Sequence, residues 1–401
     1  MRKRMKRAAI AINSVAVFLM TFLAVGNSIL PSDIRVTEDI PVLARVYMPQ
    51  KEHTSVAVMA TGIENVTFDE TYALFGTLPV KTVSVTHAPR QTVCVGGDVI
   101  GLELLTDGVV VTDMQSFETE NGEVAPAKDA GLEKGDLITH VDGIEIADNE
   151  SFSAAIEKSG GKNVELTVLR ENKELKISVL PRKCKQNEKF RCGAWVRDST
   201  VGIGTMTCYD PVTGIYAALG HCVSDCVTGE ELPIAGGRIV GANVWNIKKG
   251  ERGTAGELGG TLEEDVIGSI EKNTQTGVYG ILYEEPLNAG EYPVAWATEV
   301  KTGPAQILLS LDGEKIESYE AQISRINIDY NAEIKNMVVE ITDEELLEKT
   351  GGIVQGMSGS PIIQDGMLVG AVTHVLVNDP TKGYGIFIEN VLNAAGTLAV
   401  E

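Results

Sequence analysis

One short stretch of the chain places a serine hydroxyl among glycines. The sequence GMSGSP at residues 356–361 lies between two apolar, strand-like runs. Acyl transfer needs an exposed nucleophile and backbone N–H groups directed at the developing oxyanion. Gly356 would let its N–H point into such a site, and the N–H of Ser358 would be the second donor. We therefore predict that Ser358 is the nucleophile and that Gly356 and Ser358 form the oxyanion hole. Ser360 is a rival hydroxyl, and a tight glycine-serine hairpin is the non-catalytic alternative.

A serine nucleophile needs a general base, and the chain has only five histidines. His221 is the best placed, because it follows the apolar run 215–220 where a strand gives way to a loop. It also precedes the serine in the chain. The alternative is an ordinary loop histidine. The remaining histidines are His53, His87, His140 and His374.

A third, acidic member is less well defined by the sequence. Asp225, Asp265, Asp312, Asp329 and Asp343 all lie between the base and the nucleophile. The sequence TDEELL at residues 342–347 is typical of a capping box, and acidic residues are favoured at a helix start by the helix dipole alone. The residues by themselves leave the choice open.

The composition sets limits on the class of protein. A chain of 401 residues predicts two or three domains, and 43% hydrophobic residues can form a substantial core. Few aromatic residues and many glycines favour β structure with many loops. A net charge of -22 argues against nucleic acid as a partner. No zinc-type cysteine pairing, P-loop or dinucleotide fingerprint is present, so we expect no metal and no cofactor.

The N-terminus has the pattern of a membrane segment. Five basic residues within positions 2–7 precede an apolar run at 8–25. We predict a signal-anchor or signal peptide at 1–30, with 24–26 as a possible cleavage site. The rest of the chain would then work outside the cytoplasm. Residues 31–89 are predicted to be a connector with short strands.

A second module begins near residue 90. The sequence AKDAGLEKGDLITHVDG at 127–143 predicts a short helix ended by glycine, a turn, and a strand ended by Asp-Gly. The helix predicted at 149–158 and the strands predicted at 164–168 and 175–179 complete an order that resembles a PDZ domain over 90–183.

The PDZ resemblance implies that a peptide adds as a strand beside a glycine-rich loop, here 96–102. On that basis the predicted peptide-binding residues are Val99, Ile100, Gly101 and Leu102, although Asp98 would repel a carboxylate. The alternative is a packing module that orients its neighbour.

Residues 184–401 are predicted to be a β-barrel domain, because short strands and glycine turns dominate there. The GMSGSP stretch resembles the nucleophile loop of chymotrypsin-like serine peptidases, and ALGHC at 218–222 resembles the AAHC signature around their base. Met357 departs from that family, which usually has Asp or Asn at its position. The whole chain is therefore expected to be mostly β with a small α+β module.

Four motifs narrow the resemblance to the stage IV sporulation protein B family, namely those at 204–207, 218–221, 350–361 and 371–375. The resemblance implies a PDZ-containing serine endopeptidase of endospore-forming bacteria, acting between the forespore and mother-cell membranes. It would cleave itself and a membrane-associated regulator of an intramembrane protease, leading to activation of a late sigma factor. It also implies that Asp343 is the third catalytic residue, with Asp225 in reserve.

Two further expectations remain open. A membrane-tethered PDZ adaptor with a catalytically dead peptidase fold is the alternative function. Of the six cysteines, Cys208 and Cys222 correspond by resemblance to a bridge that commonly supports the base in chymotrypsin-like enzymes. Buried free thiols are the favoured alternative.

Overall fold

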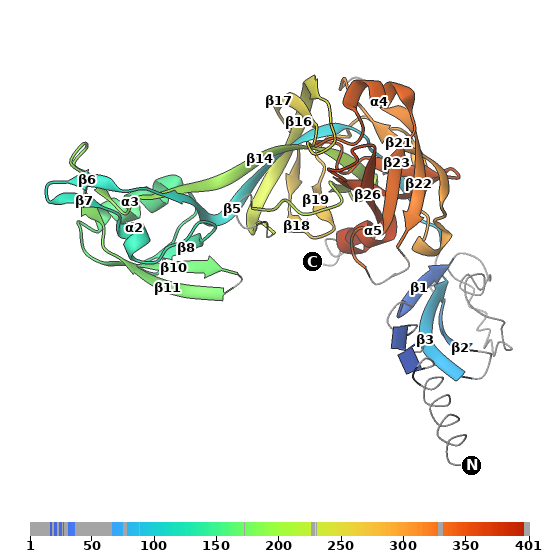
Figure 1. Cartoon of the computed structure of the whole chain (residues 1–401), viewed down its shortest axis with the longest axis horizontal. Helices are drawn as coiled ribbons and strands as arrows, with labels where there is room; N and C mark the ends of the chain where they lie inside the picture. The colour runs from blue at the N-terminus through green and yellow to red at the C-terminus, as the bar shows by residue number, and fades with distance from the viewer. Residues whose placement is uncertain are drawn as a thin grey trace, which may run out of the picture.

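We describe the fold from a computed structural model of the chain (Figure 1). The described residues are 17, 20–21, 24–25, 27, 31–36, 66–74, 78–87, 89–171, 173–225, 229, 231–313, 315–327 and 332–396. Most of the predicted signal-anchor, together with His53 and Cys226, lies outside them. Within the described residues, no helix combines the length and apolar character needed to span a membrane.

The described part of the predicted connector forms a small sheet. Its strands are β1 (Asp33–Val36), β2 (Val66–Leu74) and β3 (Leu78–His87), in the order β1-β3-β2. β1 runs parallel to β3, and β2 runs antiparallel to it.

The predicted PDZ domain has a five-stranded arrangement in the order β11-β10-β8-β5-β14. Its sheet contains β8 (Leu137–Val141), β10 (Val164–Arg170) and β11 (Lys173–Val179), with short α2 (Pro126–Asp129) and longer α3 (Asn149–Lys158) against it. The Asp148 side chain accepts a hydrogen bond from the Ser151 N–H at 2.7 Å and so caps α3. Buried aliphatic side chains of the sheet pack with Phe152 and Ile156 of α3.

Two long strands are shared between the predicted PDZ domain and the predicted peptidase domain. β5 (Val99–Met114) and β14 (Ala194–Tyr209) each have 16 residues and pair antiparallel along most of their length. In Figure 1 they cross from the PDZ domain at one end into the peptidase domain at the centre. The boundary predicted at residue 90 therefore differs from the structure, because β4 (Thr92–Val95) and the first half of β5 pair within the peptidase sheet.

The first half of the peptidase domain is built around these long strands. β16 (Ile234–Lys248) pairs with β5 on one side and with β17 (Glu257–Ile270) on the other. β14 continues through β15 (Ile215–Ala218) to β19 (Gly277–Ile281) and β18 (Lys272–Thr274). Tyr216 and Tyr279 are fully buried in this half.

The second half is a closed barrel in the order β21-β22-β23-β26-β25-β24. Its strands are β21 (Gly303–Leu309), β22 (Glu317–Ile326), β23 (Met337–Ile341), β24 (Pro361–Gln364), β25 (Met367–Val375) and β26 (Lys382–Phe387). Helix α4 (Glu344–Thr350) precedes the nucleophile loop, and α5 (Ile388–Gly396) follows the barrel. The expectation of a mostly β chain with a small α+β module is confirmed.

The remaining elements are short. They are β6 (Phe117–Thr119), β7 (Gly122–Val124), β9 (Ile144–Glu145), β12 (Arg182–Lys183), β13 (Phe190–Arg191), β20 (Glu291–Pro293) and the 3₁₀ turn η2 (Ala297–Glu299).

The structure contradicts the predicted peptide-binding residues. Ile100 has Gly204 of β14 as its partner on one side and Gly241 of β16 on the other. The whole run Val99, Ile100, Gly101 and Leu102 is paired with β14, and all of it except Val99 is paired with β16 as well. A peptide cannot add to a strand whose two edges are taken. The prediction failed because local sequence identifies a strand but not its neighbours.

Candidate active site

The nucleophile loop lies between α4 and β24, and two glycines shape it. Gly356 has φ +100° and Gly359 has φ +98°, conformations that favour glycine. A Cβ on Gly359 would also lie 1.9 Å from the carbonyl oxygen of Thr205. The loop can therefore form only with glycine at this position, close against β14. Met357, which replaces the residue typical of chymotrypsin-like enzymes, is fully buried in the barrel core.

Two backbone N–H groups of the nucleophile loop are available as hydrogen-bond donors. Within the described part of the chain, the N–H groups of Gly356 and Ser358 donate no hydrogen bond. The neighbouring N–H groups of Met357 and Gly359 are instead bonded to the carbonyls of Val354 and Val372. The two groups assigned to the oxyanion hole are thus the ones left available to a ligand.

Thr205 of β14 fixes the peptide planes beside these donors. Its hydroxyl donates to the Gly356 carbonyl at 2.7 Å, and its N–H donates to the Ser358 carbonyl at 2.8 Å. Two residues along β14, the Thr207 hydroxyl donates to the Gly359 carbonyl at 2.8 Å. The 204–207 motif was visible in the sequence, but no local signal showed that its threonines meet a loop so distant in the chain.

His221 follows β15 through a tight turn. Leu219 and Gly220 both have positive φ, at 69° and 67°, and the Leu219 N–H donates to the Thr205 carbonyl at 3.3 Å. The Nδ1 of His221 lies 2.7 Å from the carbonyl oxygen of Cys222. With the proton on Nδ1, that carbonyl accepts it and Nε2 is left as the basic nitrogen. Burial lowers the pKa of His221, and the hydrogen bond to Cys222 opposes that change.

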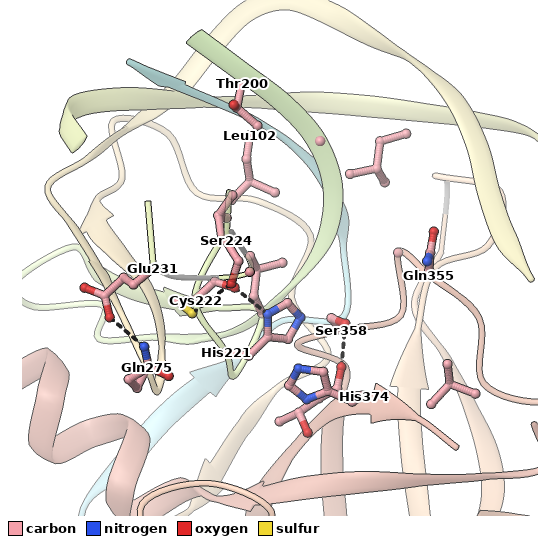
Figure 2. A pocket seen from close by; sticks show the side chains of 18 of the residues that line it. Leu102, Thr200, His221, Cys222, Ser224, Glu231, Gln275, Gln355, Ser358 and His374 are labelled. Carbon is pink, nitrogen blue, oxygen red and sulfur yellow. Dashed lines mark hydrogen bonds between the residues drawn. The ribbon is translucent and has the colours of Figure 1, made fainter. Parts of the chain in front are cut away.

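A second histidine lies beside the first. The ring centroids of His221 and His374 are 4.5 Å apart, and Figure 2 shows both rings next to Ser358. Burial, with repulsion from His221 and Lys335, lowers the pKa of His374 to about 4. His374 is therefore neutral near neutral pH. No local feature of the sequence indicates that His374 lies beside His221.

The Ser358 hydroxyl donates to the carbonyl of Thr373 on β25 at 2.6 Å (Figure 2). The hydroxyl is therefore directed at the barrel wall in this state. A rotation about the serine side chain is needed before its proton can pass to the base.

Ser358, His221 and His374 line one pocket of about 1180 Å³. Its wall also includes Gln355, Gly356 and the β14 segment 200–203. Among the described residues, no group of His, Cys, Asp or Glu side chains has the arrangement of a metal site.

Two family models match the chain. The SpoIVB peptidase S55 model matches residues 188–392, and the PDZ domain model matches residues 99–180. The chain belongs to the SpoIVB peptidase S55 family. The predictions of a serine peptidase and of a PDZ domain are confirmed. Comparison with curated proteins gives no significant match.

Several solved structures are similar to parts of this S55 peptidase. The PDZ domain of an SdrC-like protein from Listeria monocytogenes is 24% identical and covers 22% of this chain and 87% of its own, with a TM-score of 0.19. The active form of the Rv3671c protease from M. tuberculosis is 17% identical and covers 50% of this chain and 74% of its own, with a TM-score of 0.29. A thermostable serine protease, AL20, from an extremophilic microorganism is 12% identical and covers 49% of this chain and 92% of its own, with a TM-score of 0.29.

In this S55 peptidase the two proposed acids are engaged elsewhere. Asp343 caps α4, because its Oδ1 accepts from the Leu346 N–H at 2.9 Å and its Oδ2 from the Glu320 N–H at 3.2 Å. It is absent from the pocket lining. Asp225 forms an ion pair with Arg197 at 2.8 Å. The structure brings neither carboxylate to Nδ1 of His221, where the Cys222 carbonyl lies instead.

The described cysteines are free thiols. Cys208 is 1% exposed, and burial raises its pKa to about 12. Cys222 is partly exposed, and its Sγ lies 3.4 Å from the Oγ of Ser224. No bridge joins Cys208 to Cys222; Cys208 is a buried free thiol, as the favoured alternative expects, whereas Cys222 is free but not buried.

Proposed function

We propose that this S55 peptidase is a sporulation signalling serine endopeptidase that cleaves itself and a membrane-associated regulator of an intramembrane protease, so that a late sigma factor is activated. The family match supports the signalling role through the family's name. One observation carries the chemistry: Ser358 and His221 line the same pocket, beside the two free N–H groups of Gly356 and Ser358.

The geometry supports the following course of reaction. The Ser358 hydroxyl turns from the Thr373 carbonyl towards His221, whose Nε2 accepts its proton as Oγ attacks the substrate carbonyl. The N–H groups of Gly356 and Ser358 stabilise the oxyanion. The Cys222 carbonyl holds the Nδ1–H of His221 and so keeps Nε2 basic. His221 then returns the proton to the leaving amine.

We propose that the chain acts outside the cytoplasm, attached through its N-terminus in the space between forespore and mother-cell membranes. The basic residues before the apolar run at 8–25 support this placement. The net charge of -22 agrees with protein rather than nucleic acid as the partner.

One observation favours the second candidate, a membrane-tethered PDZ adaptor with an inactive peptidase fold. The Ser358 hydroxyl is hydrogen-bonded to the Thr373 carbonyl, and among the described residues no carboxylate is bonded to Nδ1 of His221. In the first proposal this arrangement is a resting state, whereas in the second it is permanent.

A fluorophosphonate probe separates the two candidates. We expect covalent labelling of Ser358 in the purified full-length protein. Ser358→Ala should abolish labelling, and His221→Ala should reduce it to a comparably low level, because members of a catalytic unit fail together. Labelling of a different residue, or none in the folded protein, would favour the adaptor.

The signalling role needs a separate test in sporulating cells. We expect Ser358→Ala to block appearance of the late sigma factor's activity while the variant accumulates normally. Normal late gene expression in that strain would contradict the signalling role and leave the peptidase assignment intact.

A further inference from the structure

The strand that holds the nucleophile loop has a second edge that no other strand covers. β14 pairs with β5 and then β4 on one side, and on its other side only residues from Met206 to Tyr209 pair with another strand, β15. Along 194–204, within the part of the chain that the structure describes, this other edge has no partner strand. An uncovered edge is a template for an added peptide strand.

The orientation of the backbone groups on this edge follows from Thr205. Its N–H donates to Ser358, and its carbonyl accepts from Leu219, so both point away from β5. The pairing with β5 is regular from Ser199 to Thr205. Because such groups alternate along a strand, those of Ser199, Val201 and Ile203 point to the uncovered edge as well.

This edge leads directly to the nucleophile. The segment 200–203 lines the same pocket as Ser358 and His221. The side chain of Val201 is 61% exposed, so nothing within the described chain covers it. A strand that pairs with Val201 and Ile203 would enter the catalytic pocket.

The other end of the edge lies beside helix α3 of the PDZ domain. The Asn149 N–H at the start of α3 donates to the Asp198 side chain at 2.9 Å, and Glu157 near its end forms an ion pair with Lys189. The side chains of Ala194 and Val196 pack with the cluster that contains Phe152 and Ile156 of α3.

Buried polar atoms without partners gather along this track. Of the eight such side-chain atoms in the described chain, three belong to Asn149, Arg197 and Thr200. Arg197 and Thr200 are on β14, and Asn149 contacts β14 through Asp198. Buried polar groups normally have partners, so these three indicate a polar ligand.

The charge at the far end sets the direction of the ligand. Arg182 and Arg191 lie directly opposite one another in the β12–β13 ladder, just before β14 begins. Both are exposed, and the described chain gives neither an ion-pair partner. Two unpaired cations side by side, in a chain of net charge -22, fit a carboxylate.

We propose that the uncovered edge of β14 is a continuous substrate track, on which a peptide runs antiparallel to β14 from the catalytic pocket to a C-terminal carboxylate near Arg182 and Arg191. The residues that follow the scissile bond occupy the track. This inference rests on the peptidase activity proposed above but not on the signalling role. It assigns peptide recognition to β14, a strand outside the part of the chain that the PDZ family model matches.

The length of the track predicts where cleavage occurs. Each strand residue advances the chain by about 3.3 Å, so the segment 193–203 accommodates about ten substrate residues. The substrate class is therefore a polypeptide with a free, accessible C-terminus, cleaved about ten residues before its end.

The test uses the purified full-length protein and a mixed library of peptides of about 25 residues, made with free or amidated C-termini. Mass spectrometry locates the cleavage sites. We expect cleavage of the free-acid library to concentrate about ten residues from the C-terminus. Amidation should reduce this cleavage roughly tenfold, as expected when hydrogen bonds to a charged group are lost.

Two charge-reversal variants provide the comparison. Arg191→Glu should remove both the positional preference and the effect of amidation, while the rate of fluorophosphonate labelling at Ser358 stays unchanged. Lys173→Glu, on β11 at the opposite edge of the PDZ sheet, should change neither the positional preference nor the effect of amidation.

Cleavage sites spread evenly along the free-acid library, in a protein whose Ser358 labels normally, would overturn the track and keep the peptidase. A preference that persists in Arg191→Glu would overturn the position of the carboxylate. Absence of labelling in the wild type would instead contradict the peptidase activity itself.

Discussion

Thr205 contacts both halves of the catalytic apparatus. It holds the carbonyls of Gly356 and Ser358 and accepts a hydrogen bond from Leu219, two residues before His221. It is fully buried and does not line the catalytic pocket, so it acts by positioning the nucleophile loop and the oxyanion donors. Its hydroxyl is the part that a substitution can remove without changing the shape of the side chain.

Thr205→Val should lower kcat by roughly tenfold to a hundredfold, less than the loss of a direct oxyanion donor. KM should change little, because the substrate contacts remain. Thr205→Ser, which keeps the hydroxyl, should recover most of the activity. Steady-state kinetics on one peptide substrate measures both effects. A valine variant as active as the serine variant would show that the hydroxyl has no positioning role.

The titration of His221 sets the acid limb of the pH profile. The base must be neutral, and burial lowers its pKa from the ordinary histidine value of 6.5. Protonation then occurs at lower pH, so activity should persist below pH 6.5 and fall only as the pH drops through the lowered pKa. A profile of kcat/KM against pH measures this limb. An acid limb centred above pH 6.5 would contradict the role assigned to His221.

At the scale of elements, α4 explains why an acidic residue stands at position 343. Asp343 accepts two backbone hydrogen bonds, one from the first turn of the helix and one from Glu320 of β22. These bonds attach the start of α4 to the barrel just before the nucleophile loop. A helix cap needs only a hydrogen-bond acceptor, whereas a catalytic acid needs a negative charge. Substitutions of Asp343 can therefore distinguish the two roles.

Asp343→Asn should keep most of the labelling rate at Ser358 and lose less stability than the alanine variant, because the amide oxygen still caps the helix although its NH2 group cannot accept from the Glu320 N–H. Asp343→Ala should cost about 1 kcal/mol in the free energy of unfolding. Thermal unfolding and probe labelling of both variants provide the measurement. If the asparagine variant is stable yet labels orders of magnitude more slowly, Asp343 is the third catalytic residue in the active state.

At the scale of the whole molecule, β5 and β14 join the two domains without a linker. Figure 1 shows them as a continuous two-stranded ribbon between the PDZ domain and the peptidase domain. A deletion of 90–183 would remove β4 and half of β5 from the peptidase sheet and would test folding rather than regulation. A better place to shorten the chain lies within the β5–β14 pairing, because Leu105 of β5 and Ser199 of β14 lie directly opposite one another.

Replacing residues 106–198 with Asn-Gly should close β5 and β14 as a hairpin and leave the peptidase domain folded. We expect Ser358 to label at a rate within a few-fold of the full-length protein. The choice of cleavage site should change, because the carboxylate end of the track is gone. Circular dichroism establishes folding. Loss of labelling in a folded variant would show that the PDZ domain belongs to the catalytic unit.

The sequence by itself determined the parts of the protein that depend on local chemistry. The GMSGSP loop, the histidine after an apolar strand and the AGLxxGD turn indicate a serine peptidase with a PDZ domain, because glycine turns and strand runs are local features. The helix start near residue 343 was also legible, although the structure makes Asp343 itself the N-cap, one residue later than the capping box at 342–345 predicts.

Only the tertiary structure decided which distant segments meet. Local sequence does not determine which strands pair. The sequence therefore could not show that Val99–Leu102 is buried between β14 and β16, or that Thr205 holds the nucleophile loop. The neighbour of His221 is likewise a matter of packing: the chain brings His374 and a backbone carbonyl to it, where resemblance implied a carboxylate.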